Sequence, residues 1–173
     1  MPSDDLSNWA KKWNRAAKRE VVFSPRDEGL KVKVVPTGIT ALDAALGPLN
    51  QEEQGFPRGR LTIIVGEPSS GKTLLTQLAM AACQRQGGRA LFFDIERCAD
   101  PRWFELTGVN TNEDKLLIVR PMTLEQTFDM VVSALEELQP EMLVVDSIPA
   151  MVPKAVLLAE MEKQDFRGVT ARK

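Results

Sequence analysis

The sequence predicts an α/β fold in which a parallel sheet is flanked by helices. From residue 60 onward, apolar runs typical of buried strands alternate with segments whose apolar residues recur at helical spacing. One such run, Leu61–Val65, leads directly into Gly66–Thr73, which matches the pattern G-x-x-x-x-G-K-[ST]. Because parallel strands need crossover helices, the alternation predicts a sheet that is covered on both faces.

The first segment, from Ser3 to about Arg19, is predicted to be an amphipathic helix. Its apolar residues recur every three or four positions, and they are Leu6, Trp9, Ala10, Trp13, Ala16 and Ala17. A terminal helix with two tryptophans on one face is expected to dock on its own domain or on a neighbouring subunit. The sequence favours neither. Its basic residues fit a solvated face better than a nucleic-acid contact.

The domain prediction separates this helix and a linker, residues 1–31, from a main domain, residues 32–173. A short strand at Val32–Val35 and a helix that opens after Pro36 begin the main domain. Its further strands are predicted at Leu61–Val65, Ala90–Asp94, Leu116–Arg120 and Met142–Asp146, and its further helices at Lys72–Arg85, Pro101–Leu106 and Leu124–Leu138. Ligands bind at the carboxyl ends of such strands. The residues predicted to share that edge are Gly66, Asp94, Glu96, Arg120 and Asp146.

Composition excludes several classes of site. The 173 residues suffice for one domain with a sizeable core, and a net charge of −2 gives no global attraction to nucleic acid. The absence of histidine excludes His-based zinc sites and Ser-His-Asp chemistry. Two cysteines are too few for a disulfide framework, and no apolar run approaches 18 residues. These observations predict a cytoplasmic protein with no membrane association.

The Gly66–Thr73 segment is the strongest candidate binding site. Its glycines allow backbone angles that turn successive N–H groups inward, and the following helix adds a partial positive charge at its N-terminus. Lys72 can reach the β- and γ-phosphates, and the Thr73 hydroxyl can ligate Mg²⁺. The nucleotide contacts predicted here are Gly66, Glu67, Pro68, Ser69, Ser70, Gly71, Lys72, Thr73 and Leu74. A Gly/Ser turn that matches by chance is the alternative, and the strand and helix around it disfavour that alternative.

Acidic residues follow two of the predicted strands. Asp146 ends an apolar strand and is a candidate Mg²⁺ ligand, with capping of the next turn as the alternative. Glu96 could polarise a water molecule for attack on a γ-phosphate, or it could instead form an ion pair with an arginine such as Arg97. Downstream, Asp100 and Trp103 could bond and stack on a base, although Trp103 could equally be a core residue.

The span from Pro36 to Arg172 resembles the ATPase core of RecA-family DNA recombinases. The resemblance rests on several motifs in order: Thr37-Gly38, Leu42–Gly47, Gly66–Thr73, Asp94-x-Glu96 with Asp100-Pro101, Thr123-x-x-Gln126, and Val144–Ser147 with Ala150, Val152, Pro153, Lys154 and Ala155. It implies ATP and Mg²⁺ as ligands, single-stranded and homologous duplex DNA as partners, and a filament in which the N-terminal helix packs on the adjacent subunit.

The resemblance also implies a role for each matching residue. Glu96 and Lys72 would be catalytic, Thr73 and Asp146 would hold Mg²⁺, and Asp100 and Trp103 would contact adenine. The segment from Pro153 to about Gly168 would form the first of two DNA-binding loops. The basic residues expected to contact DNA are Lys154, Lys163, Arg167 and Arg172.

The chain departs from the family pattern in several places. Glu67-Pro68 inverts the usual order, Trp103 replaces a tyrosine, and the sequence stops at Lys173, where the family continues to a second DNA loop and a C-terminal domain. The leading expectation is an ATP-dependent, single-stranded-DNA-binding recombinase of recombination and repair, with DNA-dependent ATPase activity. The alternatives are a non-catalytic, nucleotide-responsive module that joins or regulates a recombinase filament, and an ATPase of the RadA or KaiC type.

Overall fold

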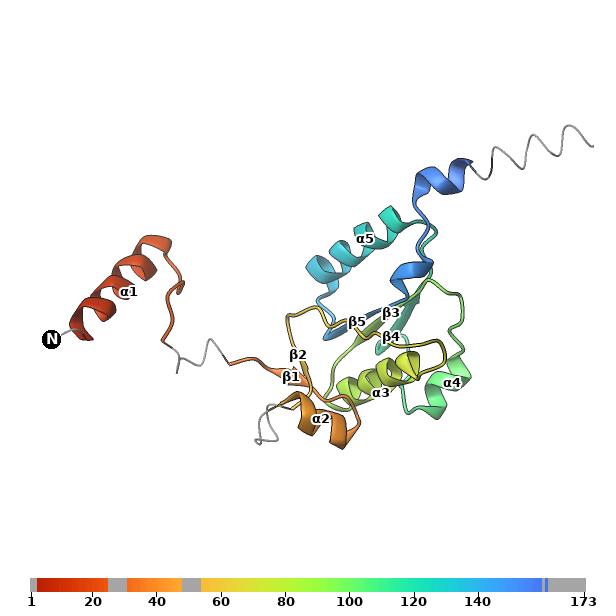
Figure 1. Ribbon diagram of the computed structural model, residues 1–173, viewed down its shortest axis with the longest axis horizontal. Coiled ribbons are helices and arrows are strands. Elements are labelled where there is room, and N and C mark those ends of the chain that lie inside the picture. The colour runs from red at the N-terminus through yellow and green to blue at the C-terminus, as the bar shows by residue number, and fades with distance from the viewer. Residues whose placement is uncertain (1–2, 25–30, 48–53, 160, 162–173) are drawn as a thin grey trace, which may run out of the picture. The chain divides into compact units, whose positions relative to one another are not determined.

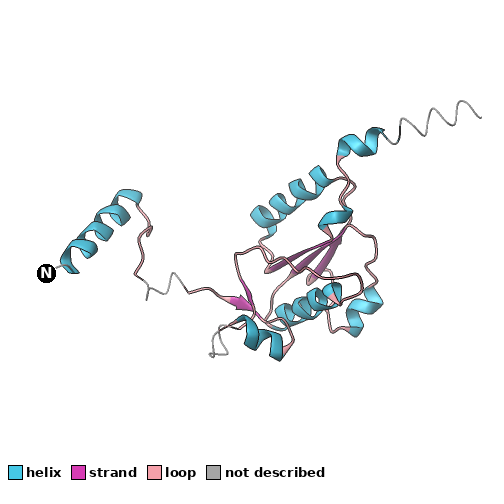
Figure 2. Cartoon of the chain, viewed as in Figure 1, coloured by secondary structure: helices cyan, strands magenta, loops and turns pink. Residues whose placement is uncertain are grey.

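A computed structural model describes residues 3–24, 31–47, 54–159 and 161 of the chain (Figures 1 and 2). These residues belong to two compact units, Met1–Lys33 and Val34–Lys173. Within the described residues, no helix combines the length and the apolar character needed to cross a lipid bilayer.

The described part of the first unit contains the helix α1, which runs from Ser3 to Ala17 and so ends two residues before the predicted boundary. Trp9 and Trp13 lie one turn apart with ring centroids at 6.1 Å, and both side chains are about half exposed. The Asn14 side chain fixes the chain beyond the helix, because its Oδ1 accepts the backbone N–H groups of Val21 and Val22. The docking surface predicted for α1 remains a prediction.

The second unit is a mixed α/β structure built on a three-stranded parallel sheet, as the alternating pattern predicts. The strand order is β4 (Leu116–Val119), β3 (Ala90–Asp94) and β5 (Met142–Asp146). In the register of β3 and β5, Asp94 lies opposite Asp146 at the carboxyl edge. A separate two-stranded antiparallel ribbon joins β1 (Val34–Val35) to β2 (Phe56–Pro57).

Helices cover both faces of this sheet because side chains of β3 alternate between them. Ala90 and Phe92 pack against α3 (Lys72–Arg85) and α4 (Pro101–Leu106). Leu91 and Phe93 face the other way and pack against α5 (Leu124–Ser133) and the turn of π-helix that follows it, Ala134–Leu138. Figure 1 shows α3 and α4 on one side of the sheet and α5 on the other.

The predicted strand at Leu61–Val65 is wrong. The segment has no regular structure, and it joins β2 to the loop before α3 as a plain coil (Figure 2). Leu61, Ile63 and Val65 are 85%, 68% and 88% exposed. An apolar, β-branched run favours an extended chain, but a strand also needs a neighbour, and among the described residues neither sheet pairs with this segment.

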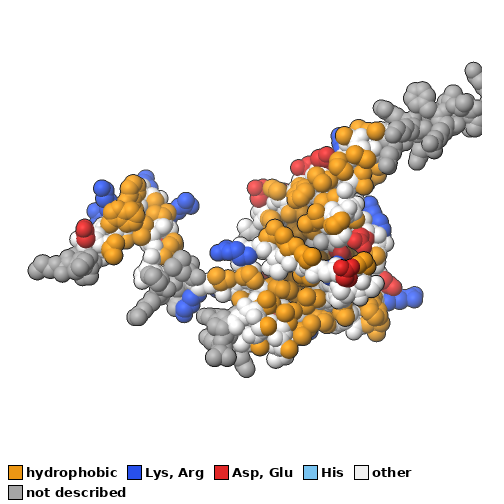
Figure 3. Space-filling view, viewed as in Figure 1, with side chains coloured by type: hydrophobic (Ala, Val, Ile, Leu, Met, Phe, Trp, Pro, Cys, Tyr) orange, Lys and Arg blue, Asp and Glu red, His pale blue; other side chains and the backbone are white. Residues whose placement is uncertain are grey.

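Smaller differences concern where elements end. The helix predicted over Leu124–Leu138 is α5 up to Ser133 and a π-helical turn thereafter, closed by Gln139 in the left-handed region at φ 46°. Arg120, predicted as the last residue of a strand, lies just beyond β4. Figure 3 shows apolar side chains on the visible surface of this unit. The exposed apolar residues of the unit include Phe128, Val132 and Leu135 of α5 and its extension.

Candidate functional site

The Gly66–Thr73 loop curls tightly before α3. The Ser70 N–H donates to the Glu67 carbonyl oxygen at 3.2 Å, and a Cβ added at Gly66 would lie 2.7 Å from Ser70 Oγ. Gly71, the residue before α3, adopts φ 90°, a left-handed conformation that favours glycine. Because Gly71 supplies no side-chain cap, the first amide groups of α3 remain available to an anion.

The ammonium group of Lys72 lies against the same loop. Its Nζ donates to the carbonyl oxygens of Gly66 at 2.9 Å and Glu67 at 2.8 Å. Both acceptors are neutral backbone groups at the exposed mouth of the loop, so the positive charge has no anionic partner among its recorded contacts. A cation held in this position adds to the attraction of the helix N-terminus for phosphate.

Thr73 and Asp146 meet although 73 positions separate them in the sequence. The Thr73 hydroxyl, in the first turn of α3, donates to Asp146 Oδ2 at 2.7 Å, at the end of β5. This contact brings together the two residues predicted to hold Mg²⁺. A hydroxyl and a carboxylate are hard oxygen donors, and a magnesium ion that keeps several waters needs few protein ligands.

Glu96 lies beside the end of β5, where it contacts the backbone of Asp146 and the side chain of Ser147. The N–H groups of Ile95 and Glu96 donate to the Asp146 carbonyl oxygen at 2.9 and 3.2 Å. The Ser147 hydroxyl donates a short hydrogen bond to Glu96 Oε1. The alternative interpretation of this acid was an ion pair with an arginine such as Arg97. The Arg97 guanidinium donates instead to the carbonyl oxygen of Pro121 at 2.9 Å.

Negative charge accumulates at this edge of the sheet. The pKa of the Cys98 thiol is raised, first by its partial burial and then by the charges of Asp146, Asp94 and Glu96. The contribution of the three carboxylates to this shift, secondary to burial, indicates a negative local potential beside the thiol. The donor set and this potential both fit a divalent cation between Thr73 and Asp146.

Of the two residues predicted to contact adenine, Trp103 lies on α4 and Asp100 lies immediately before it. Asp100 caps this helix, since its Oδ1 accepts the Arg102 N–H at 2.9 Å. Trp103 is 52% exposed, which disfavours the alternative that it is a core residue. Phe104 is the buried residue of α4, and its ring meets the Phe92 ring edge to face with centroids 5.2 Å apart. The recorded hydrogen bonds of Asp100 and Trp103 link neither residue to Thr73, Glu96 or Asp146.

One of the predicted DNA contacts falls in the described structure. Lys154 is exposed at the start of the last helix, residues 154–159, and its backbone N–H donates to Glu125 Oε2 at 2.9 Å. That bond contributes to the lowered pKa of Glu125, after the bond from the backbone N–H of Glu125 itself. The other predicted contacts, Lys163, Arg167 and Arg172, lie outside the described residues.

Sequence reasoning missed the parts played by Ser147 and by Asp94 with Arg120. Ser147 follows an acid at a strand end, a position that invites no specific prediction, and its bond to Glu96 depends on how β3 and β5 pair. Asp94 ends a fully buried strand, and an acid at such a place needs a counter-charge. The sequence therefore indicated that Asp94 needs a positively charged partner, but it did not identify Arg120 as that partner.

The chain matches the family model of the RecA N-terminal domain over residues 6–173. It is 42% identical over 141 residues to Protein RecA of Francisella tularensis subsp. novicida (strain U112), and equally to Protein RecA of subsp. tularensis (strain SCHU S4 / Schu 4) and of subsp. holarctica (strain LVS). Each alignment covers 82% of this chain and 37% of the relative, so the chain spans little more than a third of these relatives. Because the family model matches nearly the whole length of the chain, the chain belongs to the RecA family.

Proposed function

We propose that this chain is the nucleotide-binding core of an ATP-dependent, single-stranded-DNA-binding recombinase. The observation that carries the proposal is the hydrogen bond between Thr73 and Asp146, which joins the Gly66–Thr73 loop to the carboxyl end of β5. Glu96 lies at the same end of β5, because its N–H donates to the Asp146 carbonyl oxygen and its side chain accepts the Ser147 hydroxyl. Two motifs far apart in the sequence therefore converge on one side of one sheet.

In this proposal the loop and the start of α3 bind the phosphates of ATP. Backbone N–H groups between Gly66 and Leu74, other than at Pro68, donate to phosphate oxygens, and Lys72 exchanges its two carbonyl partners for the β- and γ-phosphates. Thr73 and Asp146 hold Mg²⁺, which when bound neutralises charge on the phosphate oxygens. Asp100 and the exposed ring of Trp103 contact adenine.

Glu96 orients the attacking water. Ser147 occupies Oε1, and within the described part of the chain no donor is recorded for Oε2, which can therefore accept a proton from water. The bonds of Ile95 and Glu96 to the Asp146 carbonyl oxygen set the distance between this carboxylate and the Mg²⁺ ligands. Phosphoryl transfer depends on such positioning more than on covalent chemistry with the protein.

The DNA-binding and assembly parts of the proposal rest on the resemblance. The segment after Pro153, with Lys154 exposed near its start, is proposed to contact single-stranded DNA. The α1 helix, with its exposed tryptophans, is proposed to pack on an adjacent subunit and so to build a filament that also takes up homologous duplex DNA.

The test is ATP turnover with and without single-stranded DNA, measured at several protein concentrations. DNA stimulation that rises cooperatively with concentration is the expected result. Lys72→Ala should lose nucleotide affinity, whereas Glu96→Gln should bind ATP normally and fail to hydrolyse it. Normal hydrolysis by Glu96→Gln would show that the assignment of the catalytic acid is wrong.

One observation favours a second candidate, a nucleotide-responsive module that binds ATP without DNA-stimulated turnover. Leu61, Ile63 and Val65 are exposed, and residues 61–65 pair with neither described sheet. The Gly66–Thr73 loop is therefore held to the sheet through α3 and not through a strand of its own. A loop anchored on one side can bind phosphate yet position it too loosely for hydrolysis. Saturable ATP binding with no turnover, with or without DNA, would select this candidate.

A further inference from the structure

Three carboxylates lie at the carboxyl edge of the sheet, and they differ in their burial and in their hydrogen-bond partners. Asp94 and Asp146 are register partners on β3 and β5, and Glu96 follows two residues after Asp94. Asp94 is completely buried, Asp146 is partly exposed, and Glu96 is exposed. Only two of the three acids can therefore reach a ligand that enters from solvent.

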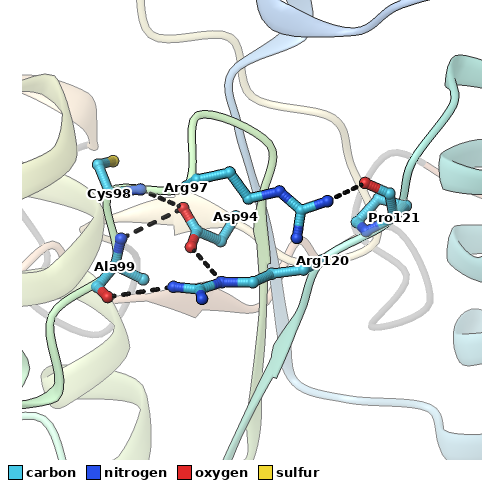
Figure 4. A network of polar contacts seen from close by, with 6 residues as sticks. All are labelled: Asp94, Arg97, Cys98, Ala99, Arg120 and Pro121. Atoms are coloured by element: carbon cyan, nitrogen blue, oxygen red, sulfur yellow. Dashed lines mark hydrogen bonds and ion pairs between the residues drawn. The ribbon is translucent and has the colours of Figure 1, made fainter. Parts of the chain in front are cut away.

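The carboxylate of Asp94 is engaged on both oxygens by the protein itself. Oδ1 accepts the backbone N–H groups of Cys98 at 2.9 Å and Ala99 at 3.2 Å. Oδ2 accepts Nε–H of Arg120 at 2.8 Å (Figure 4). A buried carboxylate that already accepts three donors has little hydrogen-bonding capacity left for a cation or a substrate.

Two arginines link the end of β3 and its following loop to the residues just after β4, one arginine reaching from each side. Arg120, just beyond β4, reaches to Asp94 and also donates to the carbonyl oxygen of Ala99 at 3.4 Å. Arg97 reaches back from the loop after β3 to the carbonyl oxygen of Pro121, as Figure 4 shows. The loop of residues 95–99 is thus fixed at its start to β5 and at its end to Asp94 and Arg120.

We propose that Asp94 and Arg120 are positioning residues that hold this loop so that Glu96 stays beside Ser147 and Asp146. The inference rests on the proposed function, because Glu96 is the group that the pair positions. Without Arg120, the buried Asp94 charge lacks its counter-ion, and the loop must open to let water solvate the carboxylate. Glu96 then moves with the loop, while Lys72 and Thr73 keep their places on α3.

Turnover and nucleotide affinity should respond separately to this change. In Arg120→Gln, kcat for ATP in the presence of single-stranded DNA is expected to fall about 10- to 100-fold, since a misplacement near 1 Å costs about that much. The Kd for a non-hydrolysable ATP analogue should change less than about threefold, because binding depends on the loop and α3. The matched control is Arg85→Gln, at the exposed end of α3 and outside this network, which should leave both values unchanged.

A double variant distinguishes positioning from a general loss of structure. In Asp94→Asn/Arg120→Gln the neutral amide at position 94 can still accept the Cys98 and Ala99 N–H groups, and no buried charge remains. Its kcat should therefore exceed that of Arg120→Gln by about tenfold, a non-additive coupling of the two positions. A double variant no more active than the single one would overturn the charge-pairing basis of the proposal.

Amide hydrogen exchange tests the same inference without nucleotide. The Cys98 and Ala99 amides are expected to exchange at least about tenfold faster in Arg120→Gln than in the wild type or in Arg85→Gln, because opening of the loop exposes them. Unchanged exchange, or an unchanged kcat, overturns the positioning role. If the wild-type chain neither binds nor hydrolyses ATP, the proposed function fails, and exchange still decides whether the pair orders the loop.

Discussion

Replacing Phe104 should undock α4, the helix that carries Trp103 and is capped by Asp100, the two residues predicted to contact adenine. Phe104 is fully buried and is the only buried residue of the six in α4. Burying a phenylalanine contributes about 1.5 to 3 kcal/mol, and the edge-to-face contact with Phe92 adds about 0.5 to 1.5 kcal/mol. With the cavity left behind, Phe104→Ala should lower the free energy of unfolding by about 3 to 5 kcal/mol.

The neighbouring residue supplies the comparison. Trp103 is 52% exposed, so Trp103→Ala should lower the free energy of unfolding by less than about 1 kcal/mol while weakening the preference for ATP over other nucleotides. Phe104→Leu, which changes volume little, should cost about 1.5 kcal/mol or less and keeps the comparison possible if Phe104→Ala does not fold.

Urea unfolding and competition between ATP and GTP are the two assays for this prediction. Phe104→Ala should lose both stability and base preference, and Trp103→Ala should lose base preference alone. Equal losses of stability in the two variants would mean that Trp103 is a core residue and that the assignment of α4 to adenine is wrong. A loss below about 1 kcal/mol in Phe104→Ala would refute the view that this side chain docks the helix.

Three further predictions concern single groups. Gly71→Ala should lower the free energy of unfolding by about 1 to 2 kcal/mol, because φ at this position is 90° and an added Cβ, with no atom within 4 Å, would cause backbone strain alone. It should also weaken ATP binding. Gly59→Ala, at φ 65° with equal space, should lower the free energy of unfolding by a similar amount in urea but leave ATP affinity unchanged. The pKa of Cys98 is raised by burial and by nearby carboxylates, so the midpoint of its pH–rate profile for alkylation should lie above the ordinary value. A midpoint at or below the ordinary value would contradict a negative potential at this edge of the sheet. The Arg89 N–H holds the pKa of Glu141 below its ordinary value, so this acid stabilises the fold above its ordinary pKa and loses that effect as the pH falls through the lowered one. The stability difference between the wild type and Glu141→Gln, followed by thermal unfolding, should therefore vanish in acid.

Local patterns in the sequence predicted the elements that local physics controls. The bounds of β3, β5, α3 and α4 agree with the structure, because each has its own signal: an apolar run of strand length, or a helical period opened by glycine or proline. The shared edge of Asp94 and Asp146 also followed from a rule of topology, since carboxyl ends of parallel strands lie together. Thr73 reaches the same edge from α3 and not from a strand, so that rule does not explain its contact with Asp146.

Pairing between distant segments could not be predicted in the same way. The pattern at Leu61–Val65 specifies an extended apolar chain, and nothing within it specifies a neighbour. Likewise, Arg97 follows β3 and Arg120 follows β4, so the sequence alone allows either arginine to pair with the acid at the end of β3. Only the strand order, with β4 next to β3, brings Arg120 to Asp94 and turns Arg97 toward Pro121.

The bare run of Leu61, Ile63 and Val65 has a practical consequence for any assay of assembly. An extended, apolar, uncharged stretch can add itself to a sheet edge of a second molecule, and light scattering would then grow with protein concentration in the absence of nucleotide and DNA. Ile63→Lys should abolish association of that kind and spare ordered filaments. Light scattering of the Ile63→Lys variant without ATP and DNA is therefore the better reference for measuring ATP- and DNA-dependent polymerisation.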